Sequence, residues 1–248
     1  MHEKTCEHCL KTYQTNDSQQ QFCGKSCATS HRWAGRFNAD FWNEDTPTTA
    51  YWAGFVMADG HVTDEGRLSI TLHPQDRPHL QMFLDALEAD EICSISEKPC
   101  NGTLFPRVSL SSRAMSSGLS SWGLCTRKTY DVRPSQKWDI HPQSFLRGLW
   151  DGDGSIYRTN RDGRWSAQIV GNSVLTSWVS DTLESLDIPT TSYTRYRRGG
   201  FAVNSLRVDR AGVLASFIEH IGYLDNDLPA LARKRDRARE AHTWATNR

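Results

Sequence analysis

The sequence predicts an α+β protein made of two pseudo-symmetric repeats that follow a small N-terminal zinc knuckle. The main observation is an internal repeat, because residues 145–155 have a looser copy at residues 51–61. Gly54 aligns with Gly148 and Asp59 with Asp153, both with an offset of 94 residues (148 − 54 and 153 − 59). Two further observations are the common order of helix and strand patterns after each copy, and four cysteines near the N-terminus.

The composition is that of a globular chain of 248 residues, long enough to bury a core in one large or two medium domains. Nothing in it resembles a signal peptide or a membrane span, so we expect a soluble, intracellular protein. Seven cysteines form an odd and unevenly spaced set, which favours metal ligation in a reducing compartment over a disulfide framework. The formal net charge of zero does not by itself indicate a nucleic-acid partner.

The N-terminal segment, residues 1–37, carries two close pairs of cysteines whose spacing matches a tetrahedral zinc site. These cysteines are Cys6, Cys9, Cys23 and Cys27. His8 or His31 could replace one thiolate, and four free surface cysteines are the alternative. The basic and aromatic residues 30–37 could dock on a phosphate backbone or form the buried face of a linker helix.

Each copy of the repeated motif predicts a helix. Thr46 is a suitable N-cap and Pro47 a suitable first residue for the first helix, which we expect to run to about Ala58. A glycine inside a helix costs about 1 kcal/mol relative to alanine, so it is usually there for a packing reason. Gly54 and Gly148 therefore indicate that the two helices pack closely against each other.

The motif aspartates, Asp59 and Asp153, should then lie near each other at adjoining helix ends. Gly60 and Gly154 follow them, and glycine is the residue favoured just past a helix C-terminus. The helix dipole is negative at that end, so two carboxylates there are unfavourable without cations. Because Mg²⁺ is a natural partner of carboxylate oxygens, we predict a divalent-metal site at Asp59 and Asp153.

The segments after each motif alternate between strand and helix periods in the same order, so each repeat is predicted to read αββαββα. In the first repeat, residues 46–138, the patterned segments after the motif helix are 68–72, 76–87, 92–98, 105–111 and 113–122. In the second repeat, residues 139–248, the motif helix at 142–152 is followed by patterned segments at 165–169, 173–186, 190–197, 201–208 and 211–221 and by a basic helical tail at 228–241. We expect Asp76 and Ser173 to cap the helices that begin there.

Several predicted strands carry one apolar face and one face of Arg, Ser, Thr, Gln or His. Such a β-ribbon can enter the major groove of DNA and bind base edges. Any one of these side chains could equally be an ordinary solvated residue, but the set recurs in both halves and favours a saddle-shaped sheet over duplex DNA. The candidates are Arg67, Ser69, Thr71, His73, Arg164, Ser166, Gln168, Tyr193, Arg195 and Arg197.

The two motif copies resemble the LAGLIDADG motif of homing endonucleases, and two copies in one chain resemble the single-chain, pseudo-dimeric form of that family. The resemblance covers about residues 46 to 240. It implies that Asp59 and Asp153, the last acid of each motif, are catalytic and bind the metal. The first copy departs from the pattern, because Met57 stands where an earlier acid usually falls, whereas the second copy has Asp151.

The resemblance also implies a lysine beside the metals in each half. The sequences at 126–128 and 232–234 match this basic position with Lys128 and Lys234. A cation there could stabilise charge on the scissile phosphate or help to polarise the attacking water. An ordinary solvated lysine is the alternative at each position.

The implied function is a site-specific double-stranded DNA endonuclease, acting as a monomer on a long asymmetric target and leaving short 3′ overhangs. Mg²⁺ or Mn²⁺ would support cleavage, Ca²⁺ would substitute without cleavage, and Zn²⁺ would occupy the cysteine site. Such an enzyme would work in the cytoplasm of a bacterial or phage-infected cell, or in an organelle. One alternative is a cleavage-inactive LAGLIDADG protein, either an intron maturase or a transcriptional regulator. An intein endonuclease is disfavoured, because the chain leaves no room for flanking splicing blocks.

Overall fold

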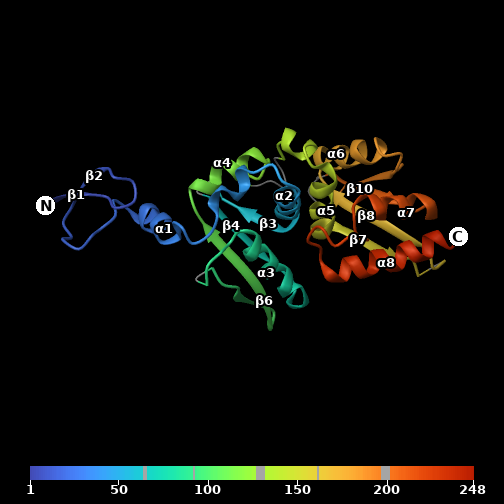
Figure 1. The fold of residues 1–248 in the computed structure, drawn as a ribbon, viewed down its shortest axis with the longest axis horizontal. Helices are drawn as coiled ribbons and strands as arrows, with labels where there is room; N and C mark the ends of the chain where they lie inside the picture. The colour runs from blue at the N-terminus through green and yellow to red at the C-terminus, as the bar shows by residue number, and fades with distance from the viewer. Residues whose placement is uncertain (64–65, 92, 127–131, 161, 197–201) are drawn as a thin grey trace.

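The computed structural model describes residues 1–63, 66–91, 93–126, 132–160, 162–196 and 202–248. An N-terminal lobe lies at one end of the molecule and is joined through α1 (Lys25–Trp33) to a body of two halves (Figure 1). The lobe contains an antiparallel hairpin of β1 (His2–Thr5) and β2 (Thr12–Thr15). Among the described residues, none of the helices has both the length and the apolar character needed to cross a membrane.

Both halves of the body have the order αββαββα that the sequence predicts. The first half consists of α2 (Pro47–Asp59), β3 (Gly60–Val62), β4 (Arg67–Thr71), α3 (Arg77–Ala86), β5 (Ser96–Cys100), β6 (Thr103–Ser111) and α4 (Ala114–Ser121). The second half consists of α5 (Pro142–Asp153), β7 (Gly154–Arg158), β8 (Trp165–Gly171), α6 (Ser173–Glu184), β9 (Thr191–Tyr196), β10 (Ala202–Val208) and α7 (Ala211–His220). A last helix, α8 (Ala232–Thr246), follows.

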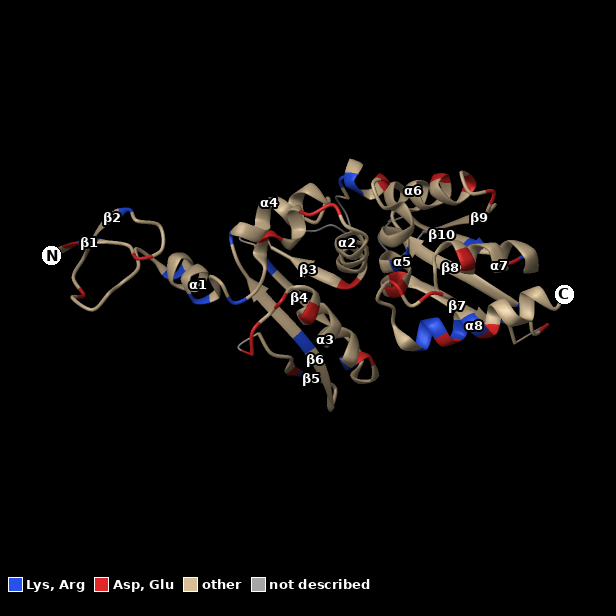
Figure 2. Ribbon diagram, viewed as in Figure 1, with Lys and Arg blue, Asp and Glu red and all other residues tan. Residues whose placement is uncertain are grey.

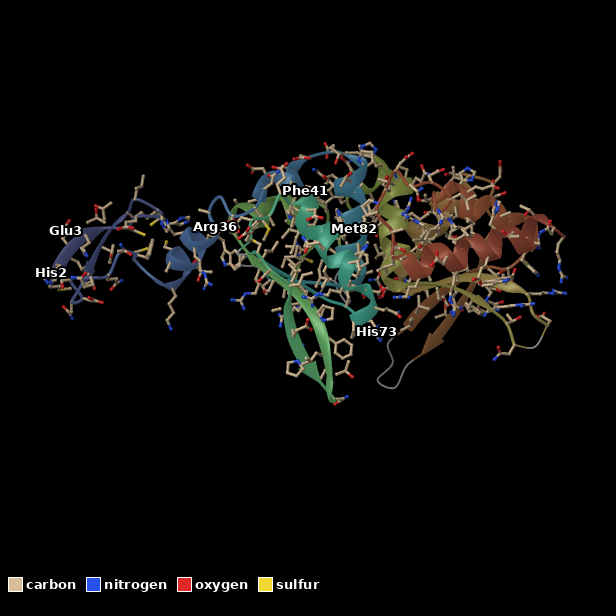
Figure 3. All side chains as sticks on the ribbon, turned by 60° about the horizontal axis from the view of Figure 1, so that its bottom comes forward. His2, Glu3, Arg36, Phe41, His73 and Met82 are labelled. Atoms are coloured by element: carbon tan, nitrogen blue, oxygen red, sulfur yellow. The ribbon has the colours of Figure 1, made fainter. Side chains whose placement is uncertain are left out.

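Each half contains one four-stranded antiparallel sheet, and the two sheets have the same topology. The strand orders are β3-β4-β6-β5 and β7-β8-β10-β9. Gly60 pairs with Ile70 in the first sheet as Gly154 pairs with Ile169 in the second, so the first strand of each sheet starts directly at the end of a motif helix. The hairpins β5–β6 and β9–β10 project from the body in the same direction, as the two sides of a saddle do (Figure 3).

One face of each sheet is apolar and belongs to the hydrophobic core, which the helices complete. Burying one leucine, isoleucine or valine side chain contributes about 1.5–3 kcal/mol. The inward residues are Leu68, Ile70, Val108 and Leu110 in the first sheet, and Ala167, Ile169, Leu206 and Val208 in the second. Because side chains alternate along a strand, the polar residues between them lie on the opposite face.

The helix starts agree with the sequence in one case and differ in two. Thr46 caps α2 as predicted, its side chain accepting a hydrogen bond from the Thr49 amide at 3.1 Å. Asp76 stands before α3 but makes no capping bond, because its buried carboxylate binds Arg233 of α8 at 3.0 Å instead. Ser173 is the first residue of α6, and the cap is Asn172, which accepts from the Leu175 amide at 3.0 Å. Asn172 has the extended backbone that an N-cap requires.

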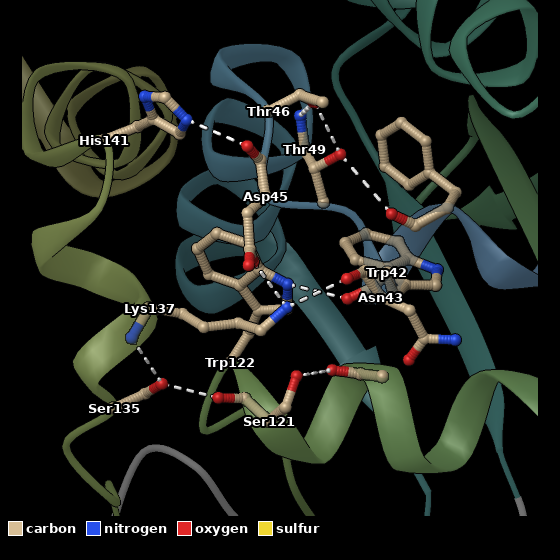
Figure 4. Close-up of polar contacts among 12 residues, drawn as sticks. Trp42, Asn43, Asp45, Thr46, Thr49, Ser121, Trp122, Ser135, Lys137 and His141 are labelled. Atoms are coloured by element: carbon tan, nitrogen blue, oxygen red, sulfur yellow. Dashed lines mark hydrogen bonds and ion pairs between the residues drawn. The ribbon is translucent and has the colours of Figure 1, made fainter.

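Polar contacts fix the segment between the two halves (Figure 4). Lys137 forms an ion pair with Asp45 at 2.8 Å, and its ammonium lies 5.0 Å from the centre of the Trp122 ring. His141, the residue before α5, is hydrogen-bonded to the carbonyl of Asp45, the residue before the cap of α2, at 3.0 Å. The two motif helices therefore start side by side.

Candidate active site at the junction of the motif helices

Helices α2 and α5 pack against each other through glycine, as the sequence predicts. A Cβ added at Gly54 would collide with the carbonyl oxygen of Phe145 and lie 2.8 Å from the amide nitrogen of Leu149. A Cβ added at Gly148 would meet Tyr51 and Phe55 in the same way. These contacts are related by the 94-residue offset, since 51 + 94 is 145 and 55 + 94 is 149. The pseudo-two-fold axis that relates the two halves therefore passes through the contact between α2 and α5.

The helices remain in contact at their C-terminal ends, where the motif aspartates lie. A Cβ on Gly152 of α5 would collide with the side chain of Ala58 and lie 3.5 Å from the amide nitrogen of Asp59 on α2. Asp59 and Asp153 are the last residues of their helices, and both are exposed. Figure 2 shows acidic residues where the ribbons of α2 and α5 end. Two carboxylates from different halves are therefore presented on one surface.

The glycines after these aspartates do not end the helices through a left-handed conformation. Gly60 has φ −79° and ψ 154°, and Gly154 has φ −78° and ψ 161°, which is extended backbone that other residues also adopt. Glycine is needed there for space, because a Cβ on Gly60 would lie 2.7 Å from Val56 and one on Gly154 would overlap the ring of Trp150. Close packing, rather than helix capping, accounts for the Asp-Gly pairs.

Asp151, the other acid of the second motif, is fully buried and belongs to a network that joins the halves. Its carboxylate accepts hydrogen bonds from the hydroxyls of Tyr51 and Tyr223, both at 2.7 Å, and from the Leu231 amide at 3.0 Å. Burial raises the pKa of Asp151, while these donors and the charge of Lys234 oppose that rise. Asp151 thus links several segments through buried hydrogen bonds and does not lie at the surface, where a metal would bind.

The network continues into the first half through His79. The hydroxyl of Tyr51 donates its proton to Asp151, so it accepts from the Nε2–H of His79 at 2.9 Å. Nδ1 of His79 is then a bare acceptor, and it has no partner among the described residues. Burial, assisted by the nearby charges of Lys234 and Arg233, lowers the pKa of His79 to about 3. This histidine is neutral near pH 7.

Lys234 is a residue of α8 whose ammonium lies against the C-terminal end of α5, and it is buried rather than solvated. Its ammonium donates to the carbonyls of Trp150 at 2.8 Å, Gly152 at 3.0 Å and Gly154 at 2.6 Å, and also to that of Asp151. Burial lowers the pKa of Lys234 to about 8, whereas nearby carboxylates, Asp59 and Asp153 among them, raise it. The second predicted lysine, Lys128, lies outside the described residues.

The predicted DNA-facing residues that the structure describes lie on or next to the polar faces of the two sheets, but their exposure differs. Ser69 is only 6% exposed and Ser166 only 3%. They are short side chains on β4 and β8, strands with a neighbour on each side, and Tyr157 pairs with Ser166. These two serines are therefore largely covered in the free protein, and their contact with DNA stays a prediction. The polar atoms of Gln168 are bonded to Ser205 at 2.7 Å and Tyr157 at 3.1 Å.

The remaining candidates are more accessible. Tyr193 is 45% exposed and lies under the guanidinium of Arg207 at 5.4 Å. The exposed candidates also include Arg67, His73 and Arg164, and Thr71 is half-buried. Arg195 is on β9, where its side chain lies outside the description, and Arg197 lies outside the described residues.

Two further arginines lie on the same polar faces, and they were not among the DNA-facing candidates predicted from the sequence. Arg107 pairs with Thr71 across β6 and β4, and Arg207 pairs with Gln168 across β10 and β8. Their Nε atoms are buried and have no hydrogen-bond partner in the described part of the chain. The alternation of apolar residues along β6 and β10 contained the signal, because it places both arginines on the outward face.

The N-terminal cysteines form a second candidate site, which is separate from the aspartates. The sulfur atoms of the four cysteines lie within 4.8 Å of one another. Cys9 and Cys23 are 3.7 Å apart, and Cys23 and Cys27 are 3.4 Å apart. Sulfurs around tetrahedral Zn²⁺ with bonds of about 2.3 Å would be about 3.8 Å apart. Cys27 is in the first turn of α1, and its hydrogen bond with Cys23 together with burial raises the pKa of its thiol to about 12.

The comparisons with known proteins agree with this geometry. Residues 141–222 match the family model described as a LAGLIDADG-like domain. The LAGLIDADG homing endonuclease I-GzeII, solved in complex with a DNA target, has 12% identity and a TM-score of 0.53 over 81% of this chain and 90% of that chain. I-DmoI, solved in complex with DNA and Ca, has 17% identity and a TM-score of 0.51 over 82% of this chain and 99% of that chain.

The same fold also occurs in a protein of another description. Full-length DUF199/WhiA from Thermatoga maritima has 16% identity and a TM-score of 0.51 over 84% of this chain, which spans 64% of that protein. None of the curated proteins matches this chain by sequence. At these identities the likeness concerns the fold: residues 141–222 match a LAGLIDADG-like domain, and the architecture is similar to that of single-chain LAGLIDADG endonucleases.

Proposed function

We propose that this protein is a divalent-metal-dependent endonuclease that cuts double-stranded DNA at a specific site. The observation that carries the proposal is the packing of α2 against α5 through Gly54 and Gly148, which places exposed Asp59 and Asp153 at adjoining helix ends. Two solved proteins of the same fold are complexes with DNA, which supports a DNA substrate for this chain. The domains would be the cysteine segment at 1–37 and repeats at 46–138 and 139–248.

The chemistry of the pair suits a hard cation. Asp59 and Asp153 offer carboxylate oxygens at the negative ends of two helices, where Mg²⁺ or Mn²⁺ would be favoured and Ca²⁺ would be a non-cleaving substitute. The bound metal would lower the pKa of a water molecule and stabilise charge on the phosphate. Hydrolysis joins a water oxygen to phosphorus and breaks the bond to the 3′ oxygen, which takes up a proton. One aspartate from each half would allow cutting of both DNA strands, and the resemblance to the family implies short 3′ overhangs.

The polar faces of the two sheets would read the target. Arg67, His73 and Tyr193 are exposed on the side away from the core, and Arg107 and Arg207 have buried Nε donors without described partners. Lys128 is a further candidate for the phosphate side of the site. Because the two halves carry different side chains, the target would be long and asymmetric, and a monomer would bind it.

The experiment starts from a randomised duplex library, because the target is unknown. Sequences that bind with Ca²⁺ would be isolated and then incubated with Mg²⁺. We expect wild-type protein to cut them, and Asp153→Asn to bind with similar affinity but lose at least about 100-fold in cleavage rate. Asp236→Asn, at an exposed aspartate of α8, is the matched control and should cut normally. Cleavage retained by Asp153→Asn would remove the role proposed for that residue.

A second candidate function is a DNA-binding regulator without cleavage activity. The structural match to WhiA favours it, because a protein that is not described as an endonuclease shares this fold. The same experiment separates the two functions. Specific binding of selected duplexes by wild-type protein, with no cut in Mg²⁺ or Mn²⁺, would support the regulator and reject the nuclease.

We also infer that the N-terminal cysteines bind one structural Zn²⁺ ion. The carrying observation is that all four sulfur atoms lie within 4.8 Å of one another, at separations that suit a tetrahedron. A hydrogen bond from the Cys6 amide to the Lys11 carbonyl at 3.0 Å and one from the Leu10 amide to the Cys6 carbonyl at 2.9 Å shape the first pair into a tight turn. Four thiolates leave no open position, so the ion would stabilise the lobe rather than catalyse.

Removal of one zinc ligand should empty this site. We expect one zinc per chain in the wild type and less than about one tenth of that in Cys9→Ser, because three thiolates bind Zn²⁺ far more weakly than four. Metal content after dialysis is the measurement, with Cys100→Ser as the control at an exposed cysteine of β5. Zinc absent from the wild type would contradict the site, and zinc retained by Cys9→Ser would point to His8 or His31 as a ligand.

A further inference from the structure

Lys234 is the most buried lysine among the described residues and is surrounded by backbone oxygen atoms. It is only 5% exposed, and its ammonium donates to carbonyls of Trp150, Asp151, Gly152 and Gly154. The last carbonyls of a helix have no partner in the helical hydrogen-bond ladder. An ammonium has three N–H groups, so all its donors can be used here without any free proton directed at solvent.

These carbonyls lie on both sides of Asp153. Gly152 precedes it and Gly154 follows it, and the ammonium binds their oxygens at 3.0 and 2.6 Å. The same turn contacts Ala58 of α2 through Gly152. We propose that Lys234 is a positioning residue, which holds the final turn of α5 so that the carboxylate of Asp153 stays aligned with that of Asp59. This proposal rests on the proposed nuclease function for its consequence in catalysis.

The electrostatics of this corner explain why a lysine tolerates burial there. Its charge lies at the negative end of the α5 dipole, and the carboxylates of Asp151, Asp59 and Asp153 all favour the ammonium form. Arg233, the preceding residue, opposes it but is itself paired with Asp76. The carbonyl groups at the end of α5 are buried or partly buried, which limits their hydrogen bonding by water. The ammonium of Lys234 donates the hydrogen bonds that water would otherwise supply.

The consequence of this geometry is specific to one half of the site. The carbonyl groups that Lys234 binds belong to the turn that carries Asp153, whereas Asp59 lies at the end of α2. Loosening the α5 turn should misplace Asp153 more than Asp59. A misplacement of about 1 Å in an active site can cost about 100-fold in rate. The DNA strand whose cleavage depends on Asp153 should therefore be cut more slowly, and cleavage of the other DNA strand should be affected less.

The backbone is tested first by amide hydrogen exchange of the full chain, which does not depend on cleavage. In Lys234→Met we expect peptides covering residues 150–156 to exchange at least about tenfold faster than in the wild type, because the cation that holds this turn is lost. Peptides covering residues 47–56 of α2 should change less. Arg237→Met, at an exposed position of the same helix, is the control. Unchanged exchange at 150–156 would overturn the proposal.

The second measurement is cleavage of a supercoiled plasmid that carries a selected target. Wild-type protein should produce linear DNA, whereas Lys234→Met should accumulate nicked circles cut in one strand, with an unchanged Kd for DNA. Lys234→Arg, which keeps the charge, should give an intermediate share of nicked circles. It replaces the methionine variant in this experiment if that variant does not fold. Equal slowing of both strands would reject the positioning role. If the wild type cuts neither strand, the nuclease proposal fails, and the exchange experiment still decides what Lys234 does for the backbone.

Discussion

Gly148→Ala is expected to lower the melting temperature by about 6–12 °C, corresponding to a loss of about 3 kcal/mol in the free energy of unfolding. The added Cβ would collide with the carbonyl oxygen of Tyr51 and lie 2.8 Å from the amide nitrogen of Phe55. Both atoms belong to the backbone of α2, so the helices can relieve the collision only by separating. Alanine gains about 1 kcal/mol in helix propensity, which is too little to offset this cost.

The control for this substitution is Gly212→Ala in α7. No atom lies within 4 Å of a Cβ placed there, and the residue is exposed in the first turn of its helix. We expect a change between zero and about 1 kcal/mol in favour of the folded state. Thermal unfolding followed by circular dichroism measures both variants. A Gly148→Ala protein as stable as the wild type would show that the helices do not depend on this close approach.

Asp151→Ala should destabilise the protein by about 3–5 kcal/mol, because it leaves buried groups without their partners. Two tyrosine hydroxyls and the Leu231 amide lose their acceptor, and the buried charge of Lys234 loses a neighbouring carboxylate. These groups come from α2, from the segment after α7 and from the segment before α8. The substitution should therefore weaken the contact between the halves as well as the docking of α8.

Urea unfolding provides the measurement for this second prediction. Asp236→Ala, at an exposed position on α8, is the matched control and should change the free energy of unfolding by less than about 0.5 kcal/mol. A loss below about 1 kcal/mol for Asp151→Ala would mean that the buried network contributes little to stability. In that case the desolvation of the carboxylate largely cancels the hydrogen bonds it accepts.

The two acids of the second motif show what can and cannot be predicted from the sequence. Asp151 and Asp153 are two positions apart on one helix, so they point to different sides of it. The resemblance selected Asp153 as the catalytic acid, which stays a prediction, and the structure places this residue at the surface. Nothing in the sequence indicated that Asp151 would bind Tyr223 and Leu231, because those partners are 72 and 80 residues away along the chain.

The strand faces illustrate the same limit. Alternation along β4 and β8 correctly separates the apolar face from the polar face. It does not predict that Ser69 and Ser166 are buried, because the exposure of a short side chain depends on its neighbours on adjacent strands. In the same way, the Asp-Gly pairs were correctly placed at the helix ends, but the reason for the glycine is the crowding by Val56 and Trp150.

The sequence by itself determined the repeat, the order αββαββα, the contact of two motif helices and the cysteine pairs, because each depends on local periodicity, on glycine spacing or on the 94-residue offset. Only the tertiary structure decided that Asp151 is an internal tie, that Asp76 binds Arg233 rather than capping its helix, and that Lys234 is enclosed by the carbonyls of α5. Those contacts join segments about 70 to 160 residues apart, and their energies depend on burial, which only the packed protein defines.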